Sequence, residues 1–124
     1  MELLRISKSD RTPSIYFNPQ EGILEMAGRS IPENAISFYK PLFDWLDTYV
    51  QNPQEETQVS FNLEYFNTSS SKCILDILRK LERLAEEKHK AVVKWFYDSE
   101  DEDMEESGND FKSLINLDIQ LVMK

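Results

Sequence analysis

The pattern of apolar and polar positions predicts strands in the first quarter of the chain. Residues 3–6 are short and apolar, as expected for an edge strand. Residues 14–18 and 23–27 are rich in β-prone side chains, and residues 19–22 between them contain Pro and Gly, which favour a turn. We therefore expect a β-hairpin over residues 14–27.

Two longer segments have the helical period. Residues 35–50 repeat apolar side chains every three or four positions, and Pro41 interrupts them, so we expect a kink or a second helical segment there. Residues 59–66 alternate like a strand, and a second helical pattern follows them. Its apolar positions are Cys73, Ile74, Ile77, Leu78, Leu81, Leu84 and Ala85.

The last third continues the alternation of strands and helices. Residues 91–97 are almost uninterruptedly apolar, which favours a strand covered on both faces. Residues 108–110 are expected to form a break, before a short helix at Phe111, Leu114 and Ile115 and a final strand over 117–122. The pattern predicts an α/β fold, a mixed β-sheet with helices packed on it, in a single domain over residues 1–124.

Composition and charge exclude several classes of function. The chain has 23 acidic and 14 basic residues and a net charge of -9, which disfavours nucleic-acid binding and docking on anionic membranes. No segment is apolar enough to insert into a membrane or to act as a signal peptide, and one Cys allows no internal disulfide. We expect a cytoplasmic protein.

Enzymatic chemistry has little support in the residues. The single His89 has no nucleophile or carboxylate at a recognisable spacing, and Cys73 lies on an apolar helix face. Seven carboxylates occur in residues 98–106, but a calcium loop would need Gly at position 103 and Glu at 109, where Asp and Asn stand. We interpret this segment as a solvated loop or helix start. We expect no metal, no cofactor and no catalytic residues.

The aromatic side chains of the first helix allow two interpretations. They could form a ligand box or pack in the core, and core packing is favoured because aromatics supply large buried areas in small domains. They are Phe38, Tyr39, Phe43, Trp45 and Tyr49.

The most informative stretch is the polar segment between strand 59–66 and the helix after it. Asn67 is followed by four hydroxyl residues, and we expect Thr68 or Ser69 to be the N-cap. The same position suits a phosphate, because free amides and the helix dipole favour negative charge there. Capping alone also explains Ser and Thr at this place.

Two segments resemble the SiaC family of bacterial regulatory phosphoproteins, residues 38–46 (FYKPLFDWL) and residues 63–72 (LEYFNTSSSK). The family is similar to STAS-domain anti-anti-sigma factors, so the resemblance implies a STAS-like fold without enzymatic activity. It also implies a Ser/Thr kinase with a histidine-kinase-like ATPase fold, an opposing PP2C-type phosphatase, and an effector similar to a diguanylate cyclase. Such an effector would connect the chain to cyclic-di-GMP signalling and biofilm formation.

The resemblance places the regulated residue at Thr68, with Ser69 as second choice. The expected partner-binding surface around it comprises Glu64, Asn67, Ser69, Ser70, Lys72 and Asp76. A constitutive protein-binding scaffold without phosphorylation is the alternative, and an enzyme with a deep polar pocket is a third.

Overall fold

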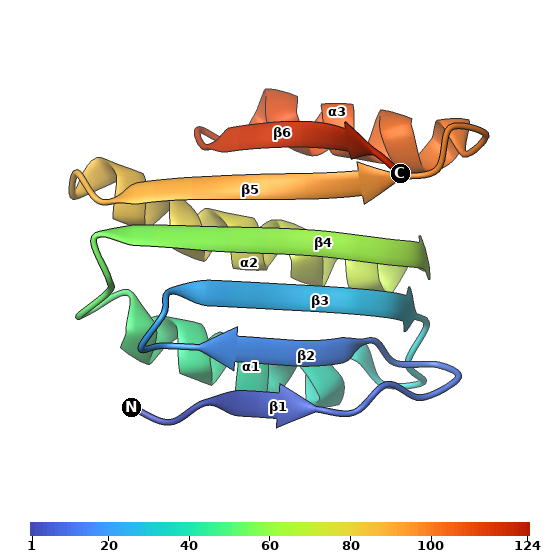
Figure 1. Cartoon of the computed structure of the whole chain (residues 1–124). Coiled ribbons are helices and arrows are strands. Elements are labelled where there is room, and N and C mark those ends of the chain that lie inside the picture. Colours follow the sequence, from blue (N-terminus) through green and yellow to red (C-terminus); the bar gives the residue numbers. More distant parts are fainter.

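The computed structural model describes all 124 residues and contains six strands and three helices (Figure 1). Their order along the chain is the order that the sequence pattern predicts. The elements are β1 (Leu4–Ile6), β2 (Ser14–Asn18), β3 (Ile23–Ser30), α1 (Ala35–Tyr49), β4 (Glu56–Phe66), α2 (Thr68–Glu86), β5 (Lys90–Tyr97), α3 (Glu102–Leu114) and β6 (Asp118–Met123).

All six strands form one mixed sheet, in which they lie side by side in chain order. β1, β2 and β3 are antiparallel neighbours, and β3 to β6 are parallel neighbours joined through α1, α2 and α3. Crossovers between parallel strands are right-handed, and each new strand is added on the same side of the previous one. All three helices therefore cover one face of the sheet, and the opposite face is open (Figure 1).

The open face corrects the expectation that strand 91–97 is covered on both sides. In β5, Val93 and Trp95 are buried under the helices, whereas Lys94 is exposed and Phe96 is half-buried. An apolar run indicates a strand, but the side taken by the crossover helices decides how many of its faces are covered.

The core lies between the sheet and the helices, and it contains 25 buried hydrophobic residues. Tyr39 and Tyr49 are fully buried, and the Trp45 ring lies 5.0 Å from that of Tyr49 and 5.1 Å from that of Phe17. Cys73 is 6% exposed. The aromatic side chains of α1 thus pack in the core, as predicted.

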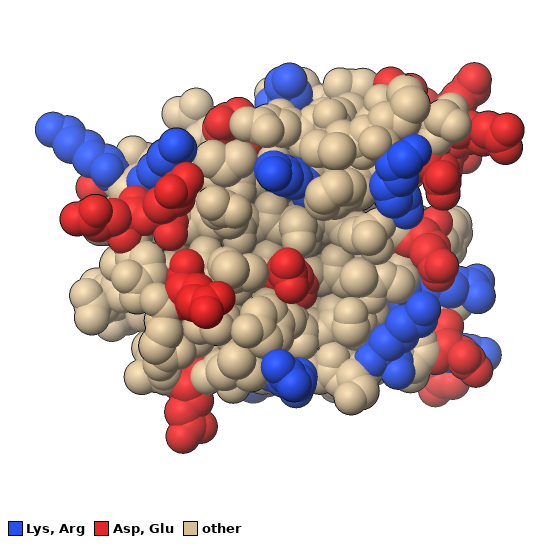
Figure 2. All heavy atoms as spheres, viewed as in Figure 1, with Lys and Arg blue, Asp and Glu red and all other residues tan.

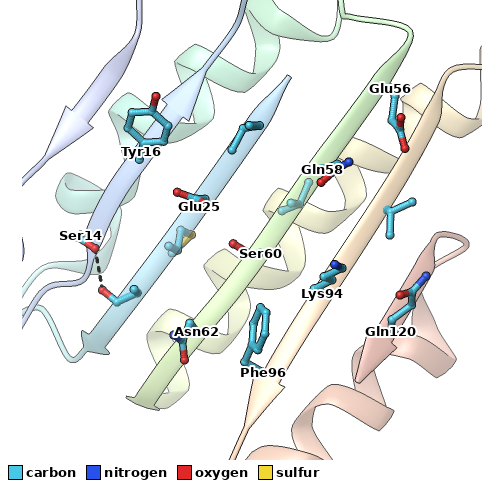
Figure 3. Close-up of a pocket in the computed structure, with 15 residues that line it drawn as sticks. Ser14, Tyr16, Glu25, Glu56, Gln58, Ser60, Asn62, Lys94, Phe96 and Gln120 are labelled. Carbon is cyan, nitrogen blue, oxygen red and sulfur yellow. Dashed lines mark hydrogen bonds between the residues drawn. The ribbon is translucent and has the colours of Figure 1, made fainter. Parts of the chain in front are cut away.

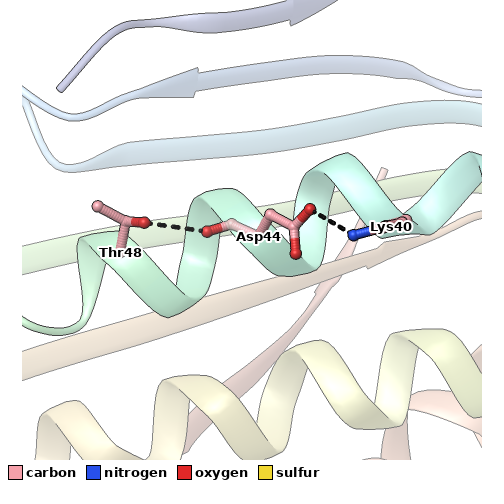
Figure 4. A network of polar contacts seen from close by, with 3 residues as sticks. All are labelled: Lys40, Asp44 and Thr48. Carbon is pink, nitrogen blue, oxygen red and sulfur yellow. Dashed lines mark hydrogen bonds and ion pairs between the residues drawn. The ribbon is translucent and has the colours of Figure 1, made fainter.

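α1 is one continuous helix, so no second segment opens at Pro41. Buried residues before and after Pro41 hold both halves of the helix against the sheet. On the exposed side, Lys40 Nζ contacts the Asp44 carboxylate at 2.9 Å, and the Thr48 hydroxyl donates to the Asp44 carbonyl at 3.2 Å (Figure 4).

α3 continues through Gly108, where the sequence predicts a break, and it is longer than expected. A Cβ atom at Gly108 would lie 2.5 Å from Cδ1 of Trp95, so the glycine lets the helix approach this ring. The Trp95 indole N–H donates to the Met104 carbonyl at 2.9 Å. The helix begins after Asp101, whose carboxylate caps it, so segment 98–106 forms a loop and a helix start.

Candidate functional site at the N-terminus of α2

The carboxyl end of β4 leads directly into α2, and Asn67 is the N-cap. Its side-chain oxygen accepts from the Ser70 amide at 2.9 Å, and its own amide donates to the Ser30 carbonyl at 3.1 Å. This corrects the expectation that Thr68 or Ser69 caps the helix. Asn caps as well as Ser, and the hydrogen bond to the end of β3 fixes Asn67 in the cap position.

Thr68 is the first residue of α2, and both Thr68 and Ser69 are exposed. The first amides of a helix have no acceptor within it, and the cap satisfies only that of Ser70. A phosphate on Thr68 would lie beside the remaining free amides and the positive end of the helix dipole. Because Thr68 is not the cap, its hydroxyl can be modified without removing a capping interaction.

Ser70 has a structural role, which corrects its place on the expected partner-binding surface. It is 0% exposed, and its hydroxyl donates to the Ser30 carbonyl at 2.9 Å. The Ser30 hydroxyl donates to Ser70 Oγ at 2.8 Å and lies 2.6 Å from the Tyr39 hydroxyl. Burial raises the pKa of Tyr39 above its ordinary value, against the lowering effect of these hydrogen bonds. The chain of hydroxyls joins α2 to β3 and α1, and it cannot contact a partner.

The other predicted site residues lie in two places. Lys72 and Asp76 follow Thr68 at intervals of four residues, so they lie along the same side of α2, Lys72 exposed and Asp76 half-buried. Glu64 on β4 is exposed, and it lies at the register shift between β3 and β4, where Gly28 pairs with Leu63 and Arg29 pairs with Tyr65. Glu64 precedes the N-cap Asn67 by three residues, and its place on the partner-binding surface stays a prediction.

Two exposed apolar side chains lie at the same end of the sheet as Thr68, and the sequence analysis did not identify them as site residues. Ile36 in the first turn of α1 is 78% exposed, and Tyr65 near the end of β4 is 54% exposed. The N-termini of α1 and α2 lie at the same end of the sheet (Figure 1). The helical period could have found Ile36, because it lies off the buried stripe of Tyr39, Leu42 and Leu46.

A second candidate surface is the open face of the sheet. A shallow hollow of about 640 Å³ crosses it from β2 to β6 (Figure 3). Tyr16, Glu25, Ser60, Lys94 and Gln120 form one row across it, each paired with the next in the strand register. The face carries separate acidic and basic groups, and an acidic group gathers where β5 leads towards α3 (Figure 2). None of the predicted site residues lines this hollow.

The remaining candidates for chemistry have structural surroundings. Burial, and then the negative charge of Asp76, raise the pKa of the Cys73 thiol, which disfavours the reactive thiolate. His89 lies just beyond α2, where its amide donates to the Leu84 carbonyl at 2.8 Å. No group of three or more His, Cys, Asp or Glu side chains is arranged to bind a metal ion. None of the three helices combines the length and apolar character needed to cross a membrane.

Comparisons with known proteins identify relatives of this chain. A family model described as SiaC family regulatory phosphoprotein matches residues 6–124. A protein of Pseudomonas aeruginosa strain UCBPP-PA14 is 32% identical over 112 residues, which is 90% of this chain and 89% of that protein.

Solved structures match the whole fold. Apo-SiaC from Pseudomonas aeruginosa superposes with a TM-score of 0.90 at 29% identity, over 98% of both chains. A chain in the crystal structure of the diguanylate cyclase SiaD in complex with its activator SiaC, from the same organism, gives a TM-score of 0.92 at 29% identity. That match covers 98% of this chain and 99% of the other. Because the family model spans nearly all of the sequence, this chain belongs to the SiaC family of regulatory phosphoproteins.

Proposed function

We propose that this chain is a cytoplasmic, non-enzymatic partner switch controlled by reversible phosphorylation of Thr68. A Ser/Thr kinase with a histidine-kinase-like ATPase fold adds the phosphate, and a PP2C-type phosphatase removes it. The observation that carries the proposal is the position of Thr68, which is exposed at the first residue of α2 while Asn67 caps the helix.

The effector of the switch is a diguanylate cyclase, bound by the unphosphorylated form. The relative SiaC is described as the activator of the diguanylate cyclase SiaD, in complex with it, and its fold covers this chain almost completely. The family description as a regulatory phosphoprotein supports a controlled interaction of this kind.

Two electrostatic effects of the phosphate oppose each other. Phosphorylation adds about -1.5 to -2 charge and three acceptor oxygens. The positive end of α2 stabilises that charge by about 0.3–1 kcal/mol at an exposed site. At an interface the phosphate must be desolvated, and an unpaired buried charge costs about 2–5 kcal/mol. The interface penalty is larger by at least about 1 kcal/mol, so phosphorylation weakens binding by about fivefold or more and leaves the domain folded.

The experiment combines site mapping with binding. The protein is purified from its own host with and without PP2C-type phosphatase treatment, and its intact mass and phosphopeptides are measured. We expect one phosphatase-sensitive phosphate on Thr68, which Thr68→Ala abolishes and Ser69→Ala does not. The two forms are then titrated with the diguanylate cyclase from the same genome, and the phosphorylated form should bind at least about fivefold more weakly.

Three results would contradict the proposal. Full phosphorylation of Thr68→Ala would show that the site is wrong. Equal cyclase affinity of both forms, or a protein that is never modified under any growth condition, would favour the alternative of a constitutive protein-binding scaffold.

A further inference from the structure

A groove between α1 and α2 has a charge that differs from the rest of the molecule. Its volume is about 360 Å³, and Phe43 from α1 and four charged residues from α2 line it. Those four are Asp76, Arg79, Lys80 and Arg83. The chain as a whole has a net charge of -9, so three cations among five lining residues are a local excess of positive charge.

The groove continues to the phosphorylation site along one side of α2. Thr68, Lys72, Arg79 and Arg83 are separated by four, seven and four residues, so they fall within about 60° of one another around the helix axis. The side from Thr68 to Arg83 is about 22 Å long at 1.5 Å per residue. Thr68 therefore stands at one end of a row of three cations, Lys72, Arg79 and Arg83. Asp76 is the one acidic residue that lines the groove.

Most of these cations are free to bind an external anion. Lys80 is already occupied, because it contacts the Asp47 carboxylate at 2.6 Å and lies 5.5 Å from the centre of the Phe43 ring. Arg79 only reaches Glu82 at 4.0 Å, and Lys72 and Arg83 form no salt bridge.

The α1 side of the groove supplies apolar contacts. Ile36 and Phe43 are seven residues apart and so lie on the same side of α1, with Ile36 78% exposed and Phe43 half-buried. Lys40 between them is paired with Asp44, so it adds little net charge (Figure 4). Phe43 thus gives the α1 wall of the groove an apolar surface, Ile36 extends this surface along α1 beyond the groove, and the α2 wall carries three cations and Asp76.

We propose that the groove between α1 and α2 binds an acidic amphipathic helix of the effector. Two packed helices offer the ridges against which a third helix packs. The carboxylates of the bound helix contact Lys72, Arg79 and Arg83, and its apolar side chains cover Ile36 and Phe43. The inference rests on the proposed function for the identity of the effector and for the role of Thr68.

This partner chemistry gives the phosphate a direct way to weaken binding. A phosphate on Thr68 would lie one helical turn before Lys72, at the end of the cationic row. It would repel the carboxylates of the bound helix and would compete with them for Lys72. A basic or neutral partner segment would lack this repulsion.

The groove can be tested without the effector, by using two synthetic peptides. Both have Leu at the first and fourth positions of each of three heptads, and the other positions are mostly Glu in one and Lys in the other. Each peptide is titrated into the full ¹⁵N-labelled chain. The Glu peptide should shift the amide signals of Phe43, Lys72, Arg79 and Arg83, more strongly at 50 mM than at 500 mM NaCl. Shifts elsewhere, no shifts, or equal shifts with the Lys peptide overturn the proposal.

Charge reversal provides the matched variants. Arg83→Glu and Arg79→Glu should each lower the affinity of the chain for the Glu peptide by about tenfold at low salt. Lys112→Glu is the control, because Lys112, like Arg83, is an exposed cation in the last turn of a helix, but on α3. An equal loss of affinity in Lys112→Glu would show that the effect comes from the overall charge of the chain. It would overturn the proposal that the groove is the binding site.

Titration of the diguanylate cyclase then separates the two proposals. Loss of cyclase binding in Arg83→Glu together with full binding by the Thr68 phosphoform would support the groove and refute the switch. Loss of binding in the phosphoform with no effect of Arg79→Glu or Arg83→Glu would support the switch and refute the groove.

Discussion

The Ser70→Ala substitution tests whether the first turn of α2 divides its hydroxyls between folding and regulation. Ser30 donates to Ser70, so Tyr39 must donate to Ser30, and Ser70 donates to the Ser30 carbonyl. Each of the three hydroxyl hydrogens therefore has an acceptor. Without the Ser70 hydroxyl, Tyr39 and Ser30 retain two hydrogens, and only one of them can be accepted within the pair.

One buried hydroxyl hydrogen is thus orphaned, and this costs about 1–3 kcal/mol. Ala is nearly as large as Ser, so a cavity adds little. Urea unfolding followed by tryptophan fluorescence should show this loss, and a loss of ~2 kcal/mol lowers the Tm by roughly 8 °C. Thr68→Ala is the control two residues away, and it should change the free energy of unfolding by less than about 0.5 kcal/mol, because Thr68 is exposed and is not the cap.

A second background checks that the loss comes from the orphaned hydrogen. In Ser30→Ala/Tyr39→Phe, no other hydroxyl depends on Ser70, so Ser70→Ala should cost only the bond to the Ser30 carbonyl, about 0.5–1.5 kcal/mol. If Ser70→Ala lowered the free energy of unfolding equally in both backgrounds, the explanation by an orphaned hydroxyl hydrogen would be refuted. A Ser70→Ala protein as stable as Thr68→Ala would refute the structural role of Ser70.

Three further predictions concern the cap, α3 and the buried tyrosine. Asn67→Ala should lower the free energy of unfolding by about 1 kcal/mol and Asn67→Asp by less, in urea unfolding, because only Asp keeps a capping oxygen; equal losses would contradict the cap. Gly108→Ala should destabilise by about 1–3 kcal/mol despite the better helix propensity of Ala, because its Cβ would lie 2.5 Å from Trp95, whereas exposed Asn109→Ala should not destabilise; a more stable Gly108→Ala would refute the close packing. Burial raises the pKa of Tyr39, so the contribution of this residue to the free energy of unfolding is complete below about pH 10 and is lost as the pH rises further. Between about pH 8 and 11, the free energy of unfolding should therefore fall less in Tyr39→Phe than in the unchanged chain. An equal fall in both proteins would contradict this prediction.

The sequence predicted the order of elements because each element has its own local period. Alternation identified the hairpin of β2 and β3, and the three- and four-residue spacing identified α1 and α2. The break expected at Gly108 failed because the helical propensity of glycine is overridden by its contact with the Trp95 ring, which is distant in the chain. The open face of the sheet was missed for a similar reason, since it depends on the common direction of three crossovers.

The strand–helix junction at Asn67 was predicted from the sequence, but the capping, exposed and buried residues within it could not be separated by propensity alone. Asn, Ser and Thr are all good caps, and the hydrogen bond from Asn67 to Ser30, 37 positions earlier, selects among them. The burial of Ser70 did have a local signal. Ser70 precedes Ile74 and Ile77 by four and seven residues, so the helical period places it on the buried side of α2. A search for apolar residues alone does not find it, because serine is polar.

The charge around the helix starts distinguishes α2 from α3 as a place for the proposed phosphate. In α3, Asp101 caps the helix and Glu102, Asp103 and Glu105 lie in the first turn, so its positive end is already neutralised. The first turn of α2 has no acidic residue, and its exposed first position is a hydroxyl. Successive helical residues point about 100° apart, so Thr68 faces solvent while Ser70 faces the core. A phosphate on Thr68 would therefore be the first anion at this helix end, and it would change the charge of the surface without entering the hydrogen-bonded chain that holds α2 on the sheet.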